Sequence, residues 1–494
     1  MPAKFHTKLS KQARKIADKI LDSDSVVIAS HIDADGISAA SVASLALGNA
    51  GIRHEVKFLK KLDDRAIKTL CKSAEQSLVW LTDLGSAYAS RFGASNVVIT
   101  DHHQTEKELQ KEGGGFQSTI FSYECMEHLN PSFFGFAGAR DISGAGLAFI
   151  VAAEMSSENQ EYAGLPIVGA IGDMQDLETR KLTGLNASIV DLGVKLGRVK
   201  RTTDLRLFGT ETRSLQRLLE FASDPMLPGL TNNPVACDEF LRMIKIETMR
   251  EERQRSWSDL SVREKNKIMG ALSRLILEND GDEDDVRRLT GEVYTFPDER
   301  KGQPTREARE FATLLNSCGR NDMPDIGMEI CKGDRGEALE RAFTLLREHR
   351  ENLSNALMFV REMGIETLGA IQHFHCADQV KDTILGAIVG ILLNSGEADR
   401  DRPLIGFAIS KETDGEYKIK ASARTTHEMV QKGVNLAIAI KRAAESVGGI
   451  GGGHNIAAGA TLPLSTEGDF LSAIEREIAR QLASHLSEAS SMPF

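Results

Sequence analysis

Three short apolar runs in the first hundred residues each stop at an acidic or imidazole side chain, and this pattern restricts the fold most. The runs are VVIA (26–29), LVWL (78–81) and VVIT (97–100). Each has the length and composition of a strand buried on both faces. Because helical patterns lie between them, they predict βαβ units and a parallel sheet. A fourth apolar run, LPIVGAIG (165–172), fits either a helix or a strand.

Polar side chains that could bind a ligand or take part in catalysis follow all four runs. In open parallel sheets, ligands bind beyond the carboxyl ends of the strands, so we expect these side chains to meet at one edge of the sheet. A single polar residue at such a place is ordinary turn chemistry. Four such clusters in one chain favour a shared site. The residues are His31, Asp33, Asp35, Asp83, Asp101, His102, His103 and Asp173.

Six of these residues form a set that suits divalent cations. Four carboxylates in one site repel each other strongly unless cations neutralise them. An oxygen-rich set with two imidazoles and no thiolate favours Mn²⁺, with Mg²⁺ as the alternative, over structural zinc. Four negative charges balance two divalent ions, and a two-metal site suits in-line attack on phosphorus. The six expected ligands are His31, Asp33, Asp35, Asp83, His102 and Asp173.

Three residues of the eight at the strand ends suggest individual roles. Asp83 comes alone from a middle strand, so we expect it to bridge the two ions. His103 adjoins a ligand and is free to meet a phosphate oxygen, where it would stabilise the charge that develops as water attacks phosphorus. Asp101 is expected to orient a neighbouring histidine. His103 and Asp101 are therefore the candidate catalytic residues.

The order and spacing of these motifs resemble a known family. His-x-Asp-x-Asp-Gly at 31–36, the isolated Asp83, Asp-His-His at 101–103 and Gly-Asp at 172–173 resemble the four motifs of the DHH phosphoesterase superfamily. The stretch GGGHNIAAGA (451–460) resembles the glycine-rich signature of the DHHA1 domain. TLLNSCGR (313–320) resembles the Asn-Ala-x-Gly-Arg element of RecJ-type single-strand nucleases, and ISGAG (142–146) fits the same group. The resemblance covers most of the chain apart from a middle segment.

This resemblance implies an activity and a distribution of ligands. It implies a single-strand-specific exonuclease that hydrolyses DNA, with RNA as a further substrate, in the presence of two Mn²⁺ ions. It gives one ion to His31, Asp33 and Asp83. It gives the other ion to Asp35, Asp83, His102 and Asp173.

Candidate substrate-binding residues lie in the second half of the chain. KIKASART (418–425) places Lys420 and Arg424 on one face of a strand; an ordinary solvated edge strand would show the same pattern. The glycine run that follows predicts a turn before a helix start, where backbone N–H groups can bind phosphate; a flexible linker is the alternative. Arg320 fits a phosphate ligand, or the end of a helix that is capped by Gly319. The eight candidates are Asn316, Arg320, Lys420, Arg424, Gly451, Gly452, Gly453 and His454.

The pattern along the chain predicts an α/β protein of several parts. A DHH catalytic domain with a parallel sheet is expected over 1–225, completed by 301–333. A helical insertion is expected over 226–300, with the acidic run ENDGDEDDVRR (278–288) as an exposed loop. A long connecting helix is expected over 334–364, closed by Gly364. A smaller, mixed-sheet DHHA1 substrate-binding domain is expected over 365–494.

Composition restricts the partners and the compartment. The net charge of −11 argues against a protein that coats nucleic acid, so a strand must be bound by a local basic patch. The six cysteines show no Cys-x-x-Cys spacing, which indicates reduced thiols. The N-terminal segment lacks the apolar core of a signal peptide, and the longest apolar run is too short to span a bilayer. We therefore expect a cytoplasmic protein without membrane association.

The chain departs from bacterial RecJ at its C-terminal end. The forty or so residues after the glycine run are too few for the oligonucleotide-binding barrel of those enzymes. This feature, and the helical insertion, resemble archaeal RecJ-like nucleases, some of which associate with the GINS replication complex; a role in DNA replication or repair is implied.

Three alternatives stay open. A short-oligonucleotide or nucleotide phosphodiesterase or phosphatase of the superfamily would use the same metals in a smaller pocket. A manganese pyrophosphatase shares the first domain, although LNSCGR argues against it. A non-catalytic replication scaffold is the third, but such relatives usually lose metal ligands and this chain has all six.

Overall fold

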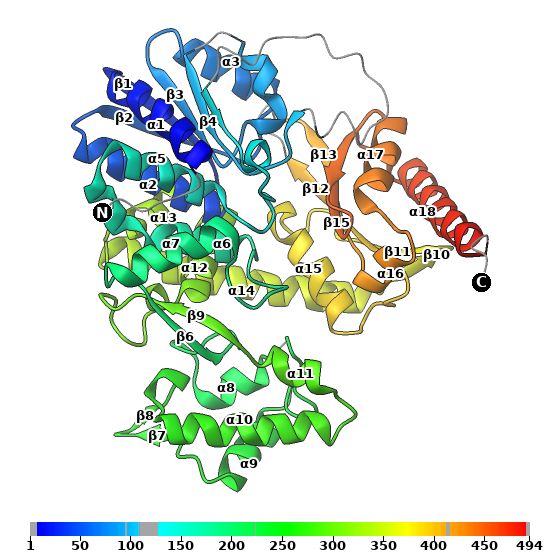
Figure 1. The fold of residues 1–494 in the computed structure, drawn as a ribbon. Helices are drawn as coiled ribbons and strands as arrows, with labels where there is room; N and C mark the ends of the chain where they lie inside the picture. Colours follow the sequence, from blue (N-terminus) through cyan, green and yellow to red (C-terminus); the bar gives the residue numbers. More distant parts are fainter. Residues whose placement is uncertain are drawn as a thin grey trace. The chain divides into compact units, whose positions relative to one another are not determined.

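The computed structural model describes residues 7–93, 96–106, 108, 127–222, 224–411 and 415–490. Residues 1–6, at the start of the N-terminal segment discussed above, lie outside this set. The chain forms two compact units, Met1–Leu346 (unit 1) and Arg347–Phe494 (unit 2), and Figure 1 shows their helices and strands. Each unit has its own sheet and its own apolar core.

Unit 1 is built around the predicted parallel sheet. Its strand order is β2-β1-β3-β4-β5, and every described pairing is parallel. The three strands expected from sequence, β1, β3 and β4, lie side by side at its centre, which confirms this part of the fold class. The bounds are β1 Ser25–His31, β2 Arg53–Leu59, β3 Leu78–Thr82, β4 Val97–Thr100 and β5 Glu127–Leu129.

The two faces of this sheet are covered by different helices. Alternate strand residues such as Ile28 and Trp80 pack on one face, and Val27 and Val79 pack on the other. Both faces are therefore buried, which explains why the strands have no polar alternation. The first face packs against α1 Thr7–Leu21, α2 Ala34–Asn49, α5 Gly144–Met155 and α6 Gly164–Gly172; the second packs against α3 Asp64–Ser73 and the 3₁₀ segment η1 Ser86–Phe92.

The small residues of α2 allow it to lie in the middle of unit 1. Its sequence ADGISAASVASLALGN is buried on nearly every side, and it packs against α5 and α6. Ala, Ser and Gly let helix backbones approach closely. The run 165–172, which fitted a helix or a strand, is the helix α6.

Unit 1 also contains an insertion with its own core, which a pair of strands connects to the rest of the unit. β6 Lys200–Leu205 and β9 Thr290–Thr295 are antiparallel, with Leu205 opposite Thr290. Figure 1 shows the segment between them on the far side of this pair from the five-stranded sheet. A separate apolar cluster around Trp257 holds it together. Its elements are α8 Leu215–Glu220, α9 Pro234–Met243, β7 Met249–Arg250, β8 Arg253–Gln254, α10 Val262–Leu277 and α11 Glu283–Arg288.

The acidic run 278–288 corrects one expectation, because its second half is helical and is not a loop. Asp282 accepts hydrogen bonds from the backbone N–H groups of Asp284 and Asp285 and begins α11. Acidic side chains at the positive end of a helix and arginines at its other end both stabilise it. The loop was expected because the run is densely acidic, and this criterion does not consider which end of a helix the charges occupy.

The rest of unit 1 consists of helices that close its core. α14 follows the insertion and runs without interruption from unit 1 into unit 2, and Gly364 lies after it with a φ of 84°. The helices are α7 Gly184–Lys195, α12 Ala308–Arg320, α13 Pro324–Cys331 and α14 Glu337–Met363.

Unit 2 contains the predicted mixed sheet. Its order is β10-β11-β12-β13-β15-β14; β11 and β12 are parallel and the other pairs are antiparallel. The strands are β10 Glu366–Leu368, β11 Ile371–His375, β12 Leu404–Lys411, β13 Tyr417–Arg424, β14 Ile450–Gly453 and β15 Ala457–Leu462. The helices are α15 Asp382–Asn394, α16 His427–Gln431, α17 Leu436–Ser446 and α18 Glu467–Ser490.

The glycine run of unit 2 corrects a second expectation. Residues 450–462 form an antiparallel strand hairpin, β14 and β15, instead of a turn before a helix. A Cβ at Gly451 would lie 2.9 Å from the Ile440 carbonyl oxygen and 3.0 Å from the Ala444 Cβ, both on α17. The glycine therefore lets β14 lie against that helix.

None of the helices in the described residues combines the length and the apolar character that crossing a membrane requires.

Candidate metal centre

The carboxyl edge of the parallel sheet gathers the eight side chains that follow the four apolar runs. His31 is the last residue of β1, Asp83 follows β3 directly, and Asp173 lies at the C-terminal end of α6. Asp33 caps the N-terminus of α2, and Asp35 lies in its first turn. The remaining three, Asp101, His102 and His103, follow β4.

The first ligand group consists of His31, Asp33 and Asp83. One potential ligand atom from each of them lies within 4.8 Å of the others. His31 Nδ1 is 2.8 Å from an oxygen of Asp33, and the other Asp33 oxygen accepts a hydrogen bond from the Gly36 N–H at 3.0 Å. This group has the composition of the first predicted ion site.

The second ligand group consists of Asp35, His102 and Asp173. His102 Nε2 lies 3.1 Å from Asp173 and 3.7 Å from Asp35. It also lies 3.3 Å from Oδ1 of Asp83, so Asp83 adjoins both groups. This position suits the bridging role expected of Asp83.

Unsatisfied buried atoms indicate that a cation fits between the groups. Both carboxylate oxygens of Asp83 and Nε2 of His102 are buried without a hydrogen bond of good geometry among the described residues. His102 Nδ1 lies 2.8 Å from the Gly138 carbonyl oxygen, so this nitrogen donates and Nε2 presents its lone pair to the carboxylates. Buried lone pairs that face each other are costly unless a proton or a metal ion lies between them. The donor set suits Mn²⁺ or Mg²⁺.

Glycines on the neighbouring helices make room for the carboxylates. A Cβ at Gly144 would lie 2.5 Å from Oδ1 of Asp83, and one at Gly169 would lie 2.2 Å from Oδ1 of Asp35. The backbone N–H groups of Gly144 and Ala145 donate to the Asp35 carboxylate at 2.6 and 3.0 Å. The ISGAG stretch therefore holds Asp35 at the N-terminus of α5. Asp83 itself has a φ of 58°, an uncommon conformation for a non-glycine residue.

The pKa values at the site reflect crowded carboxylates. Burial, with Asp35 and Asp33 nearby, raises the pKa of Asp83 well above its usual range. Burial and the neighbouring Asp173 raise the pKa of Asp35 to about 6. For His102, burial would lower the pKa, but Asp173 and Asp83 outweigh it and the pKa is raised. The cluster thus takes up protons, and divalent cations would displace them.

Asp101 and His103 form a pair beside the ligands. An oxygen of Asp101 lies 2.7 Å from His103 Nδ1, and its other oxygen accepts from the Ser86 N–H at 2.7 Å. Burial would raise the pKa of Asp101, but His103 outweighs it and the pKa is lowered. The His103 side chain is 51% exposed. Asp101 is thus a buried, charged carboxylate that holds the exposed imidazole of His103 in one orientation.

Helix α12 supports the loop of the first ligand group and corrects a third expectation. Asn316 accepts a hydrogen bond from the Ala34 N–H at 2.9 Å through its side-chain oxygen. Gly319 lies inside α12 and does not cap it; Asn321 is at the cap position. A Cβ at Gly319 would lie 1.8 Å from the Ile32 carbonyl oxygen, so the glycine permits close contact with the loop. Arg320 is half-buried at the end of this helix.

Unit 2 has its own candidate surface. Lys420, Ser422 and Arg424 of β13 project from one face, and opposite Ser422 lies Gly459, which in turn pairs with Gly452. A glycine strand beside a basic strand leaves backbone accessible next to cationic side chains. β13 is a central strand of this sheet and not the solvated edge strand of the alternative interpretation.

The other glycine-run candidates of unit 2 lie elsewhere. Gly451 and Gly453 fall on the opposite face by register, and His454 follows at the hairpin turn. The glycine at position 451 is therefore explained by its packing against α17.

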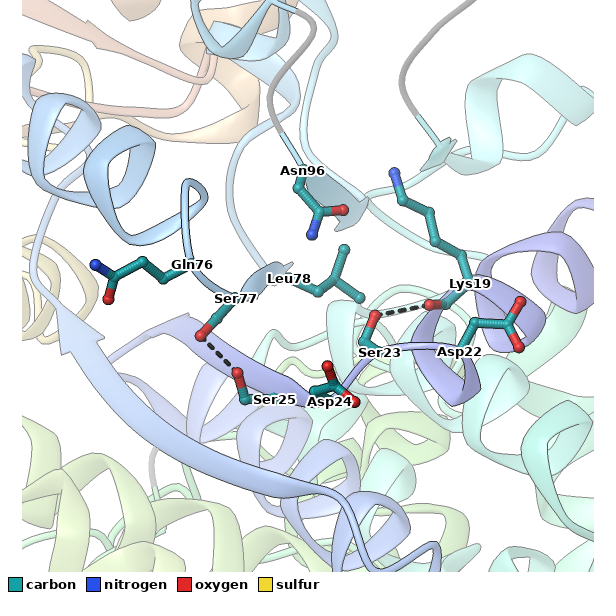
Figure 2. A pocket seen from close by; sticks show the side chains of 9 residues that line it. All are labelled: Lys19, Asp22, Ser23, Asp24, Ser25, Gln76, Ser77, Leu78 and Asn96. Carbon is teal, nitrogen blue, oxygen red and sulfur yellow. Dashed lines mark hydrogen bonds between the residues drawn. The ribbon is translucent and has the colours of Figure 1, made fainter.

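A pocket of about 540 Å³ lies at the other end of the parallel sheet in unit 1 (Figure 2). It is lined at the amino ends of β1 and β3 by polar residues that bond to each other. The Ser25 and Ser77 hydroxyls are 2.7 Å apart, and the Ser23 hydroxyl donates to the Lys19 carbonyl oxygen. The carboxylates and imidazoles with shifted pKa values lie at the carboxyl edge, so that edge is the candidate site.

Several residues that support the site were missed in the sequence. Gly138 and Gly169 provide the space, and Gln175 provides hydrogen bonds. Gln175 lies in the stretch GDMQD (172–176), only two residues from a predicted ligand, and a polar residue so close to a ligand was the available signal.

Comparisons with known proteins agree with this description. The DHH-CID domain family matches residues 207–290, which is the insertion, and the DHHA1 domain family matches residues 373–480. A relative from Methanocaldococcus jannaschii, the uncharacterized protein MJ0831, is 28% identical over 479 residues, which are 96% of this chain and 98% of that protein.

Solved structures share the fold. RecJ from Thermus thermophilus, crystallised in complex with Mn²⁺, aligns with a TM-score of 0.57 and 15% identity. The similarity covers 97% of this chain and 56% of RecJ, so this chain spans about half the length of that protein. CDC45 from Entamoeba histolytica aligns with a TM-score of 0.60 and 11% identity, over 96% of this chain and 99% of CDC45. The chain therefore contains matches to the DHH-CID and DHHA1 domain families, and it shares the fold of RecJ.

Proposed function

We propose that the protein is a two-metal phosphodiesterase that removes nucleotides from the end of single-stranded nucleic acid. The observation that carries the proposal is the position of Asp83, which adjoins two ligand groups and has both oxygens buried and unsatisfied among the described residues. A pair of divalent ions, Mn²⁺ by preference, would neutralise the charge that develops on a phosphate under in-line attack. RecJ, which shares the fold, is known in complex with Mn²⁺.

The chain's own residues divide the remaining tasks. His103 is exposed and held by Asp101, so it can donate a hydrogen bond to a phosphate oxygen. Arg320, at the end of α12, is proposed to bind a terminal or neighbouring phosphate. In unit 2, Lys420, Arg424 and the glycine hairpin are proposed to bind the phosphate backbone of the single-stranded nucleic acid.

Deletion of one carboxylate tests this proposal. The full-length protein is incubated with end-labelled DNA and RNA strands in Mn²⁺ or in EDTA. We expect stepwise shortening in Mn²⁺ and none in EDTA, and loss of cleavage in Asp83→Ala with strand binding retained. Asp191→Ala, which removes an exposed ion pair with Arg201, is the control. Cleavage by Asp83→Ala at the wild-type rate would contradict the metal assignment.

The length of the substrate separates the proposal from the small-substrate alternative. A nuclease that uses the basic face of unit 2 should prefer strands long enough to reach it. A phosphodiesterase for short oligonucleotides should lose activity as the strand grows. The same assay with strands from two to thirty nucleotides distinguishes the two.

A non-catalytic replication scaffold is the second candidate, and the likeness to CDC45 over nearly its full length favours it. The complete ligand set favours the enzyme. The insertion, which matches the DHH-CID family, is proposed as a docking surface for a replication partner such as GINS. Cleavage in Mn²⁺ together with partner binding would support both roles, and partner binding without any cleavage would leave only the scaffold.

The division of the chain into domains is also a proposal. We propose a DHH catalytic domain in unit 1 that is interrupted by the insertion between β6 and β9, and a DHHA1 substrate-binding domain in unit 2, with α14 belonging to both.

A further inference from the structure

Gln175 lies two residues after the ligand Asp173, and its buried side chain is bonded at both ends. It is 4% exposed. Its Nε2 donates to the carbonyl oxygens of Gly138 at 2.9 Å and Ile142 at 3.2 Å. Its Oε1 accepts a hydrogen bond from Asn186 Nδ2 at 2.6 Å. Because carbonyl oxygens can only accept, these partners fix the orientation of the Gln175 amide.

The Gly138 carbonyl links this amide to the ligand His102. The same oxygen accepts from His102 Nδ1 at 2.8 Å, so Gln175 holds the group that keeps the proton on Nδ1. The Gln175 nitrogen also lies 3.4 Å from His102 Nδ1, against the edge of the ring. A Cβ at Gly138 would lie 1.8 Å from the His102 carbonyl oxygen, so a glycine is needed for this approach. The imidazole is thereby held with Nε2 toward the carboxylates.

The backbone of the same turn carries Asp173. The Asp173 N–H donates to Gly169 and the Gln175 N–H donates to Ala170, both at 3.0 Å, which closes the C-terminal end of α6. One glutamine therefore joins two of the three members of the second ligand group. Sequence separation does not suggest this connection, since Gln175 and His102 are 73 residues apart.

We propose that Gln175, braced by Asn186, is a positioning residue that sets the cation affinity of the group Asp35, His102 and Asp173; this inference rests on the proposed function. It touches neither substrate nor cation. It acts by fixing the tautomer and the ring orientation of His102. Hydrogen-bond partners of metal ligands typically change metal affinity by roughly 10–100-fold when removed.

Unit 2 offers a matched control. Gln372 is 2% exposed, and its Nε2 also donates to two carbonyl oxygens, those of Asp399 and Arg402. Its Oε1 accepts from the Asp399 N–H at 3.0 Å. Gln372→Met therefore removes the same kind of buried amide outside the metal centre, and a purely structural role for Gln175 would make the two variants behave alike.

The test measures Mn²⁺ binding to the metal-free full-length protein by the electron paramagnetic resonance of the free ion. We expect two ions on the wild type and on Gln372→Met. We expect Gln175→Met to bind one ion normally and the other roughly 10–100-fold more weakly. Asn186→Leu should weaken the same ion and serves if Gln175→Met does not fold.

Two failures are distinguishable in this experiment. Folded Gln175→Met or Asn186→Leu with both wild-type affinities would overturn the inference and leave the proposed function intact. A wild type that binds no Mn²⁺ would overturn the proposed function and the inference together.

Discussion

The carboxylate of Asp83 is destabilised when it is charged. It is buried beside like-charged neighbours and has no well-aligned hydrogen-bond donor among the residues that the structure describes. Its raised pKa means that it favours folding only while protonated. That contribution is present at pH values below the pKa that Asp83 has in the unfolded chain. It is lost as the pH rises through the pKa that Asp83 has in the folded protein. At neutral pH the metal-free centre should therefore destabilise unit 1.

Asp83→Asn should reverse this penalty while removing the metal response. We expect the melting temperature of the metal-free protein at pH 7.5 to rise by about 3 °C or more, and the increase on adding Mn²⁺ to become much smaller. Asp191→Asn serves as the control. Thermal melts of the variants in EDTA and in Mn²⁺ check this, and a melting temperature of the wild type that does not respond to Mn²⁺ would count against the site.

The candidate ligands could be found from sequence, whereas the residues that support them could not. His31, Asp83 and His102 follow predictable buried strands, and the topology of a parallel sheet brings strand ends together. Gln175 and Gly138 meet His102 only through tertiary folding, so no local pattern identifies them. One of the two interpretations of LNSCGR made Gly319 a helix cap, because glycine often ends helices, but here Gly319 lies inside α12 and lets that helix approach a loop.

Helix α12 contains a buried carboxyl group, Glu310, that binds the first residues of the insertion. It is 2% exposed and accepts hydrogen bonds from the Glu211 N–H at 2.8 Å and from the Thr212 hydroxyl. Burial, followed by the charge of Glu307, raises its pKa to about 7. Its contribution to folding is complete below pH 4.5 and is lost as the pH rises through 7.

Glu310→Gln should therefore flatten the pH dependence of stability. An amide stays neutral, so the variant should gain on the order of 3 kcal/mol relative to the wild type between pH 5 and pH 8. Urea unfolding of both proteins across this range is the measurement. Parallel curves would show that Glu310 has an ordinary pKa.

The insertion is expected to be removable as an element. Leu205 and Thr290 are opposite each other on β6 and β9, and the segment beyond them has its own apolar core. Replacing residues 207–289 by a short Gly-Ser turn keeps Arg206, whose guanidinium binds the buried Asp176 at 2.5 Å. We expect cleavage of a short single strand to persist and binding to GINS to be lost.

Loss of cleavage in a folded deletion variant would instead make the insertion part of the substrate path. Circular dichroism and a cooperative melt establish folding before activity is compared. The boundaries come from the structure, because the sequence pattern placed the insertion at 226–300 and would have removed β9.

At the scale of the whole molecule, strand binding should depend on Arg424. Burial lowers the pKa of this arginine, and no carboxylate among the described residues offsets that effect. A phosphate would supply the missing charge. Arg424→Ala should weaken single-strand affinity and reduce the dependence of log K on log salt by about one contact, a slope change of roughly 0.7.

Arg442→Ala is the matched control, because Arg442 is an exposed arginine of the same unit that already pairs with Glu477 at 3.1 Å. Affinity is measured against salt concentration with Ca²⁺ in place of Mn²⁺. Equal slopes for both variants would assign Arg424 to packing and favour the small-substrate phosphodiesterase.

Two cations around one shared carboxylate are expected at the carboxyl edge of the sheet in unit 1. Anomalous scattering from a crystal of the full-length protein grown with Mn²⁺ tests this arrangement. We predict two peaks roughly 3.5–4 Å apart, one beside His31 and Asp33 and one beside His102 and Asp173, with Asp83 between them. A single peak, or none at this edge in crystals that hold Mn²⁺ elsewhere, would contradict this arrangement.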